Sequence, residues 1–169
     1  MPSSPFDILG LPARFDLDRS EIEQAYIARI ANAHPDLAAG DGDADPSALN
    51  EARTTLLDPE RRARALLAIR APDAKAPPLS PDFLAEILEV RQEAEEAVAS
   101  GDEDAVARWR QWATDRRADL AAELGTLLGS GSEPFDPMRA STAAGVLQQW
   151  RYFERMLEQV GVPAHAPDA

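Results

Sequence analysis

The tripeptide His34-Pro35-Asp36 lies between two stretches that both have helical periodicity, and it restricts how this part of the chain can fold. The proline ring removes an amide donor and disfavours helical geometry at the preceding residue, so a helix that runs toward Pro35 must end there. The two stretches therefore predict a helical hairpin whose turn presents a histidine and a carboxylate to a partner. Taken alone, the tripeptide is more typical of a simple helix stop, and the flanking sequence decides between the two interpretations.

Local signals predict a pair of short helices before the tripeptide. Residues 5–9 form a brief apolar turn that Gly10 and Pro12 close. Asp18 and Glu21 have the spacing of a capping box, which predicts the start of a longer helix. The apolar stripe of this second helix, at three- and four-residue spacing, consists of Ile22, Tyr26, Ile30 and Ala33.

Two further helices are predicted after an acidic, turn-rich stretch at residues 40–46. The first fits residues 46–57, and its apolar positions are Leu49, Ala52 and Leu56. The second begins after Asp58, which suits the cap, and Pro59 suits the first helical position. Its apolar positions are Ala63, Leu66 and Leu67.

A Pro-rich stretch divides the chain. Residues 71–81 contain four prolines, a composition typical of a stiff, extended connector. Beyond it, three long helical patterns are separated only by short turns around residues 100–102 and 129–132, which predicts an antiparallel three-helix bundle. The predicted organisation is a first domain over residues 1–70, the connector over 71–81, a helical domain over 82–161 and a disordered tail over 162–169. Because no stretch alternates with a period of two, the predicted fold class is all-α.

The apolar stripes of the bundle do not include every leucine of its helices. The first helix of the bundle already has an inward stripe of Phe83, Ile87 and Val90. We therefore expect Leu84 and Leu88 to be partly exposed, although a wide buried face fits the pattern as well. The stripe of the second helix is Val106, Trp109, Ala113, Leu120, Leu124 and Leu127, and that of the third is Val146, Trp150, Phe153, Leu157 and Val160. Trp112 lies off the stripe.

Charge and composition exclude several classes of partner. The formal net charge is −13, from 30 acidic and 17 basic residues, and such a surface repels nucleic acid and anionic membranes. The chain has no cysteine, which excludes disulfides and zinc sites built on sulfur. It also has no apolar run of the length of a membrane span, and its first residues lack the pattern of a signal peptide, so we expect a cytoplasmic protein.

No arrangement of residues in the sequence indicates a catalytic, cofactor or metal site. The histidines are His34 and His165, and neither has a nucleophile or a second ligand at a suitable spacing. Residues 41–45 resemble the opening of a calcium loop, but Pro46 and Ala52 stand where glycine and glutamate are required. We therefore expect a non-enzymatic protein without a cofactor or a bound metal.

The order of these features along the chain resembles one known family. The run from Leu9 to Asp18 looks like the start of HscB, the J-domain co-chaperone of iron–sulfur cluster assembly, and His34-Pro35-Asp36 lies where the J domain of that family has the same tripeptide. Later segments that match are Leu49-Asn50-Glu51-Ala52, Thr55-Leu56, Pro59, Arg62-Ala63, Phe83-Leu84 through Glu89, Arg91 and Arg151-Tyr152. The resemblance spans nearly the whole chain in the right order.

The resemblance implies a J domain with a helical hairpin followed by a C-terminal three-helix bundle, and it implies two protein partners. His34, Pro35 and Asp36 would contact a DnaK/HscA-type ATPase chaperone and stimulate its ATP hydrolysis. The bundle would bind an IscU-type cluster scaffold through Leu84, Ala85, Leu88, Glu89, Gln92 and Tyr152. An apolar centre with a polar rim suits a modest, transient interface.

The chain departs from the family pattern on the helix before the tripeptide. Ile27, Ala28, Ala31 and Asn32 stand where J domains usually carry lysines and arginines, and Ala85 replaces a larger apolar residue. An alternative function is therefore a degenerate J-like adaptor, which binds a scaffold or another protein without stimulating ATP hydrolysis. A third class is an enzyme with chemistry of its own. Turnover of a substrate by the isolated chain that is lost on His34→Ala would support this class.

Overall fold

The computed structural model describes residues 4–33, 45–129 and 136–159, and these residues form α-helices joined by short connections without any strand. The helices are α1 (Pro5–Leu9), α2 (Arg19–Ala33), α3 (Pro46–Leu57), α4 (Pro59–Arg70), α5 (Pro81–Ser100), α6 (Glu103–Leu128) and α7 (Pro137–Gln159). The predicted all-α class is confirmed. None of the described helices is both long and apolar enough to cross a membrane.

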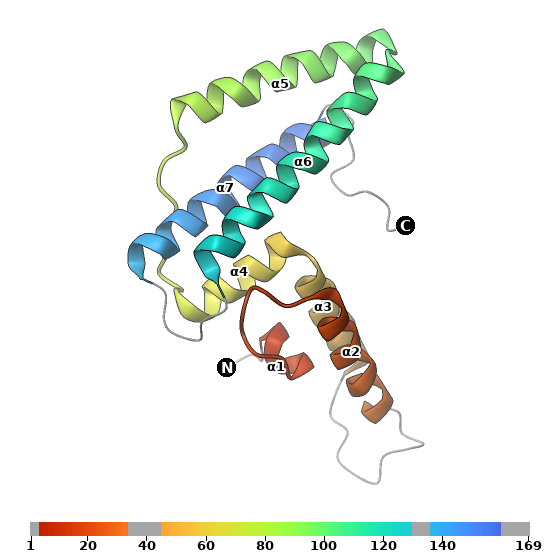
Figure 1. Cartoon of the computed structure of the whole chain (residues 1–169), viewed down its shortest axis with the longest axis vertical. Helices are drawn as coiled ribbons and strands as arrows, with labels where there is room; N and C mark the ends of the chain where they lie inside the picture. The colour runs from red at the N-terminus through yellow and green to blue at the C-terminus, as the bar shows by residue number, and fades with distance from the viewer. Residues whose placement is uncertain (1–3, 34–44, 130–135, 160–169) are drawn as a thin grey trace.

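The helices form a short N-terminal unit and a long bundle (Figure 1). In the N-terminal unit α3 packs against both α1 and α2, so that α2 and α3 form the predicted hairpin. In the bundle α6 packs along α7, and α5 contacts both of them. Helix α4 joins the two parts because it follows α3 and packs against α6 and α7.

Local caps set the starts of the helices. At α2 the amide of Glu21 donates to Asp18 Oδ1 at 2.8 Å, and the amide of Asp18 donates to Glu21 Oε2 at 3.0 Å, which is the predicted capping box. Asp58 accepts from the amide of Arg61 at 2.9 Å at the start of α4. Ser80 caps α5, whose first residue is Pro81. Each cap satisfies amides that have no partner within the helix.

Two hydrophobic cores lie along the molecule. The first core contains Phe6, Leu49 and Leu66 of the N-terminal unit together with Leu124 and Val146 of the bundle, so it crosses the Pro-rich stretch. The second core fills the other end of the bundle and consists of Phe83, Ile87, Val90, Ala94, Ala113, Phe153, Met156 and Leu157. The N-terminal unit and the near end of the bundle are therefore packed as one body around the first core.

The predicted stripe of α6 differs from the structure at one end. Leu128 is buried in the first core, whereas Leu127 is only partly buried against it. Leu128 follows Leu124 by one turn, so it continues the same face of the helix. Trp112, which lies off the predicted stripe, is half-buried, and its ring meets that of Phe153 edge-on at 5.4 Å.

The Pro-rich stretch runs against α7 after a turn. The hydroxyl of Ser141 donates to the carbonyl oxygen of Lys75 at 2.8 Å. Two residues later, Pro77 packs so closely on Gly145 that a Cβ atom at this glycine would lie 3.0 Å from Pro77 Cδ. These contacts give the extended connector a fixed course along the bundle.

Candidate protein-binding surfaces

The residues of α5 that the family resemblance singles out share one side of the helix. Leu84, Ala85, Leu88, Glu89 and Gln92 follow one another at helical spacing, and the three residues of the inward stripe occupy the opposite side. The side chain of Leu88 is 63% exposed, and Leu84 is half-buried against the second core. The expectation that both leucines are partly exposed is confirmed, and the wide buried face is not observed.

Helix α7 adds Tyr152 to the same surface. Tyr152 is 44% exposed, and its ring meets the ring of Phe83 edge-on, with 6.2 Å between the ring centroids. Because Phe83 lies in the first turn of α5 and directly precedes Leu84, this contact places Tyr152 next to the start of α5. We call the surface formed by Leu84, Ala85, Leu88, Glu89, Gln92 and Tyr152 the α5 face.

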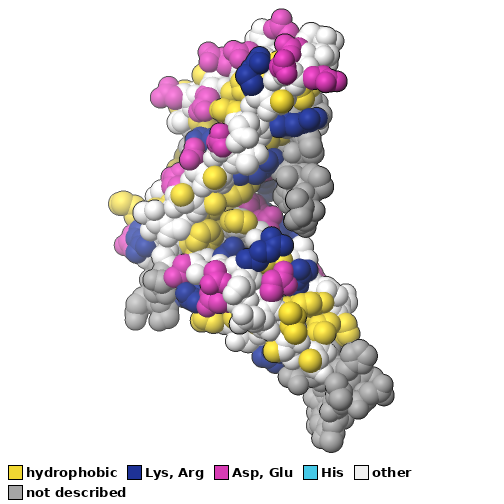
Figure 2. Space-filling model, turned by 45° about the vertical axis from the view of Figure 1, so that its right-hand side comes forward, with side chains coloured by type: hydrophobic (Ala, Val, Ile, Leu, Met, Phe, Trp, Pro, Cys, Tyr) yellow, Lys and Arg dark blue, Asp and Glu magenta, His cyan; other side chains and the backbone are white. Residues whose placement is uncertain are grey.

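The α5 face combines apolar and polar groups in a way that suits a protein partner. Leu84, Leu88 and Tyr152 supply its apolar part, and Glu89 and Gln92 are exposed beside them. The distal end of the bundle, where α5 meets α6, is strongly acidic: Figure 2 shows carboxylates gathered there. Exposed residues of this end include Glu93, Glu95, Glu96, Asp102, Glu103 and Asp104. A partner of the α5 face therefore approaches an apolar patch next to negative charge.

The tripeptide at residues 34–36 lies outside the described residues. Helix α2 is described as far as Ala33, directly before His34, so the predicted helix stop at Pro35 stays a prediction. The role of His34, Pro35 and Asp36 as a contact for a chaperone stays a prediction. Of the acidic stretch at residues 41–45, the structure describes Asp45, which caps α3 by accepting from the amide of Ser47 at 2.9 Å.

One exposed stripe of α2 carries no charge. We call the stripe formed by Ser20, Gln24, Ile27, Ala28 and Ala31 the α2 face; all five residues are exposed, and the side chain of Ile27 is 62% exposed. Figure 2 shows apolar side chains gathered on the hairpin. A partner that binds the α2 face meets methyl groups and uncharged polar groups.

Arginines are present on the hairpin, but they point elsewhere. The guanidinium of Arg29 lies against Gly10, where a Cβ atom would be 2.5 Å from Arg29 Nη2. Arg53 donates from Nε and Nη2 to Glu23 at 2.7 and 2.6 Å, and its guanidinium carbon lies 5.2 Å from the centre of the Tyr26 ring. The hydrogen bonds from Arg53 hold the pKa of Glu23 below its ordinary value. These arginines stabilise the N-terminal unit, and the sequence pattern alone does not show where they point.

The described residues offer no site for metal-dependent chemistry. Among them, no group of three or more His, Cys, Asp or Glu side chains is placed to hold a metal ion. The surfaces that stand out are instead the α5 face and the α2 face.

Comparison with known proteins agrees with these features over nearly the whole chain. Residues 79–161 match the family model of the HSCB C-terminal oligomerisation domain. The co-chaperone protein HscB homolog of Burkholderia multivorans is 34% identical over 171 residues, which cover 95% of this chain and 94% of the relative. The homolog of Burkholderia cenocepacia is 33% identical with the same coverage.

Solved structures of similar proteins have the same fold. The chaperone HscB from Vibrio cholerae aligns with a TM-score of 0.64 and 27% identity, covering 94% of this chain and 96% of that protein. Human co-chaperone protein HscB aligns with a TM-score of 0.67 and 20% identity, covering 95% of this chain and 84% of that protein. The chain belongs to the HscB family of co-chaperones, with an N-terminal J domain and a C-terminal helical bundle.

Proposed function

We propose that this protein stimulates the ATPase of a DnaK/HscA-type chaperone and delivers an IscU-type iron–sulfur cluster scaffold to it. The observation that carries the proposal is the pair of separate surfaces in a member of the HscB family. The α5 face lies on the bundle, and the α2 face leads to the tripeptide at residues 34–36 in the J domain (Figure 1). One molecule can therefore hold two partners at once.

The α5 face is the proposed scaffold site. Its exposed apolar groups lose water on binding, and the rim of Glu89 and Gln92 supplies hydrogen-bonding groups that favour one orientation of the partner. A patch of this kind fits an interface of modest size whose energy comes from a few central side chains. We assign the central role to Leu84, Leu88 and Tyr152.

The tripeptide is the proposed chaperone site. Pro35 stops α2 and holds the turn, His34 supplies a donor or acceptor on the turn, and Asp36 accepts charge-assisted hydrogen bonds from a basic group of the chaperone. ATP hydrolysis takes place on the chaperone, and the cluster is cargo of the scaffold, so this chain needs no cofactor of its own.

The uncharged α2 face favours a second candidate function. J domains usually carry basic residues here, and a chain without them has weaker electrostatic attraction to an acidic chaperone surface. The alternative is an adaptor that binds the scaffold or another protein without stimulating ATP hydrolysis.

The steady-state ATPase rate of the cognate DnaK-type chaperone, measured with this protein and its scaffold, distinguishes the two functions. We expect the native chain to stimulate hydrolysis and the Asp36→Asn variant to lose the stimulation while it still binds the scaffold. Scaffold binding by the native chain without any stimulation would contradict the co-chaperone function and support the adaptor. Failure to bind the scaffold would contradict both.

A further inference from the structure

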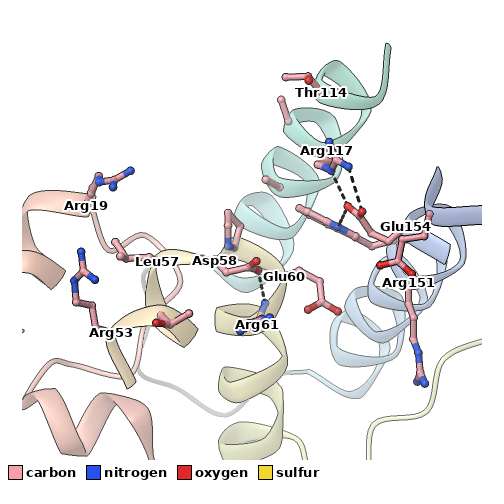
Figure 3. A pocket seen from close by; sticks show the side chains of 16 residues that line it. Arg19, Arg53, Leu57, Asp58, Glu60, Arg61, Thr114, Arg117, Arg151 and Glu154 are labelled. Carbon is pink, nitrogen blue, oxygen red and sulfur yellow. Dashed lines mark hydrogen bonds and ion pairs between the residues drawn. The ribbon is translucent and has the colours of Figure 1, made fainter. Parts of the chain in front are cut away.

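A groove of about 960 Å³ lies between the J domain and the bundle. Its walls come from the start of α2, the end of α3, the start of α4, the middle of α6 and the C-terminal half of α7, so it exists only because both parts of the molecule are packed together (Figure 3). It shares no residue with the α5 face or the α2 face, although Arg151 of its lining directly precedes Tyr152 and Arg19 directly precedes Ser20.

The floor of the groove is apolar. It includes Leu57 at the end of α3, Ala118 and Ala121 on α6, and Trp150 on α7. The indole of Trp150 is fixed because its Nε1 donates to Glu154 Oε1 at 3.0 Å. A side chain that enters the groove can therefore bury apolar surface against a preformed floor.

Arginines surround this floor, and they fall into two groups. Arg117 is held by Glu154, with Nε and Nη2 donating at 2.7 and 3.2 Å, and Arg53 is held by Glu23 as described above. Arg19, Arg61 and Arg151 are exposed, and within the described part of the chain their guanidinium groups make no hydrogen bond or ion pair.

The carboxylates of the lining are largely engaged. Asp58 caps α4, Glu60 forms an ion pair with Arg64, and Glu154 binds Arg117 and Trp150. Glu158 is the exception among the described residues of the lining. Five arginines and four carboxylates line the groove, so its lining carries a small excess of positive charge on a protein whose net charge is −13. The groove is a locally positive site with an apolar floor on a negative molecule.

We propose that the groove binds an acidic peptide segment of a protein partner, in which carboxylates flank an apolar side chain. The apolar side chain packs on Trp150 and Leu57. The carboxylates reach Arg19 and Arg61 on the J-domain side and Arg151 on the bundle side, and a guanidinium presents paired donors to each of them. The net negative charge elsewhere repels such a segment, so the groove is where an acidic partner can bind. This inference does not depend on the proposed function.

Fluorescence anisotropy with the full-length protein and a labelled peptide of Glu-Glu-Leu repeats tests the proposal. We expect saturable binding that weakens with salt, and no binding of the matching uncharged Gln-Gln-Leu peptide. The triple variant Arg19→Glu, Arg61→Glu and Arg151→Glu should weaken binding about tenfold or more. The control triple Arg108→Glu, Arg110→Glu and Arg155→Glu makes the same change of net charge at exposed arginines outside the groove and should bind within about twofold of the native chain.

A second pair of variants tests the floor. Ala118→Trp places a large side chain in the groove and should block the peptide, whereas Ala107→Trp, at an exposed position of α6 outside the groove, should not. Circular dichroism confirms that each variant is folded. Absence of peptide binding, equal loss in both arginine triples, or complete displacement of the peptide by inorganic pyrophosphate would each overturn the proposal. The last result would show a general anion site.

Discussion

At the scale of single residues, the buried guanidinium of Arg62 joins α4 to the loop before α2. Its side chain donates from Nη1 to the carbonyl oxygens of Phe15 and Leu17 at 2.8 and 2.5 Å, and its guanidinium carbon lies 5.4 Å from the centre of the Phe15 ring. Burial lowers the pKa of Arg62, while the carboxylates of Asp58 and Asp16 oppose this shift. A charge is kept inside the N-terminal unit because it satisfies two buried carbonyl groups.

Arg62→Met should therefore destabilise the protein while keeping the apolar stem in place. Two buried carbonyl oxygens lose their donors, and each unsatisfied group costs about 1–3 kcal/mol, so we expect the free energy of unfolding to fall by about 2–4 kcal/mol. Urea denaturation followed by circular dichroism measures the change. Arg64→Met is the control, because Arg64 lies on the exposed side of α4 and should change stability by about 0.5 kcal/mol or less. Equal effects of the two substitutions would contradict this role of Arg62.

The ion pair between Glu23 and Arg53 makes the hairpin sensitive to acid. The pKa of Glu23 is lower in the folded protein than in the unfolded chain, chiefly because Arg53 donates hydrogen bonds to it. Its contribution to stability is therefore present above the unfolded pKa and is lost as the pH falls through the folded pKa. We expect Arg53→Met to destabilise the protein near neutral pH and to have a smaller effect in acid.

A series of urea denaturation curves at decreasing pH measures this difference, and carbon-detected NMR titration of Glu23 should show its pKa rising in the variant. If the free energies of unfolding of the native chain and of Arg53→Met differ by the same amount from neutral to acidic pH, the charge pairing contributes nothing to stability.

At the scale of elements, α5 separates a core stripe from a binding stripe. Phe83, Ile87 and Val90 are buried, whereas Leu88 faces solvent and Leu84 is half-buried. The helix can therefore keep its fold when the binding stripe changes.

We expect Leu84→Ala combined with Leu88→Ala to weaken scaffold binding at least about tenfold, because apolar groups near the centre of an interface carry most of its energy. Isothermal titration calorimetry with the scaffold measures the change, and circular dichroism should show nearly unchanged helicity. The control Ile87→Ala, in the core stripe, should instead cost about 2–5 kcal/mol of stability. Unfolding of the double variant would show that these leucines belong to the core.

Helix α2 differs from the J-domain pattern in its exposed side. The α2 face has no charged side chain, and the nearby Arg29 and Arg53 contact the N-terminal unit itself. Association with a chaperone therefore gains little from long-range attraction, and salt has little attraction to screen.

Stimulation of the chaperone ATPase should accordingly depend weakly on salt. We expect the concentration of this protein at half-maximal stimulation to change by less than about threefold when salt rises from low to physiological concentration. The variant Ile27→Lys adds a cation to the α2 face and should restore a steeper salt dependence toward an acidic surface. A steep dependence in the native chain would mean that cations elsewhere guide association.

The elements were predictable from the sequence because their signals are local. The capping box of Asp18 and Glu21 and the cap at Asp58 act over three or four residues, and the structure confirms both of them. The surfaces depended on more distant contacts. The stripe of α5 allowed either an exposed or a buried Leu88, and the structure shows the exposed one. The contact between Tyr152 and Phe83 requires α7 to lie beside α5, which no local pattern specifies.

At the scale of the whole molecule, the sequence pattern does not specify how the J domain packs against the bundle. The four prolines of residues 71–81 predict a boundary, and we keep the division into J domain, connector and helical domain as a proposal. The first core nevertheless includes Leu66 before this stretch and Leu124 after it. The same packing creates the groove, whose arginines come from α2, α4 and α7 and have no common motif. Such sites arise from long-range packing, so they become visible only in three dimensions.

Packing of the J domain against the bundle keeps the two proposed partner sites apart on one rigid body. The α5 face lies beside the second core, against which Leu84 packs, whereas α2 packs with α3 next to the first core. The two sites share no direct contact, so a substitution at one site should leave binding at the other unchanged.

We expect His34→Gln to abolish stimulation of the chaperone ATPase while the Kd for the scaffold stays within about twofold of the native value, because sites without shared contacts act independently. Tyr152→Ala should give the opposite pattern, with weak scaffold binding and unchanged stimulation of the chaperone in the absence of scaffold. For each of the two variants, calorimetry gives the Kd for the scaffold, and ATPase rates give the stimulation of the chaperone. Loss of both activities in either folded variant would show that the two sites are coupled or are one surface. The crossed pattern would mean that this molecule links its partners by holding them in place, since neither site would then need a signal from the other.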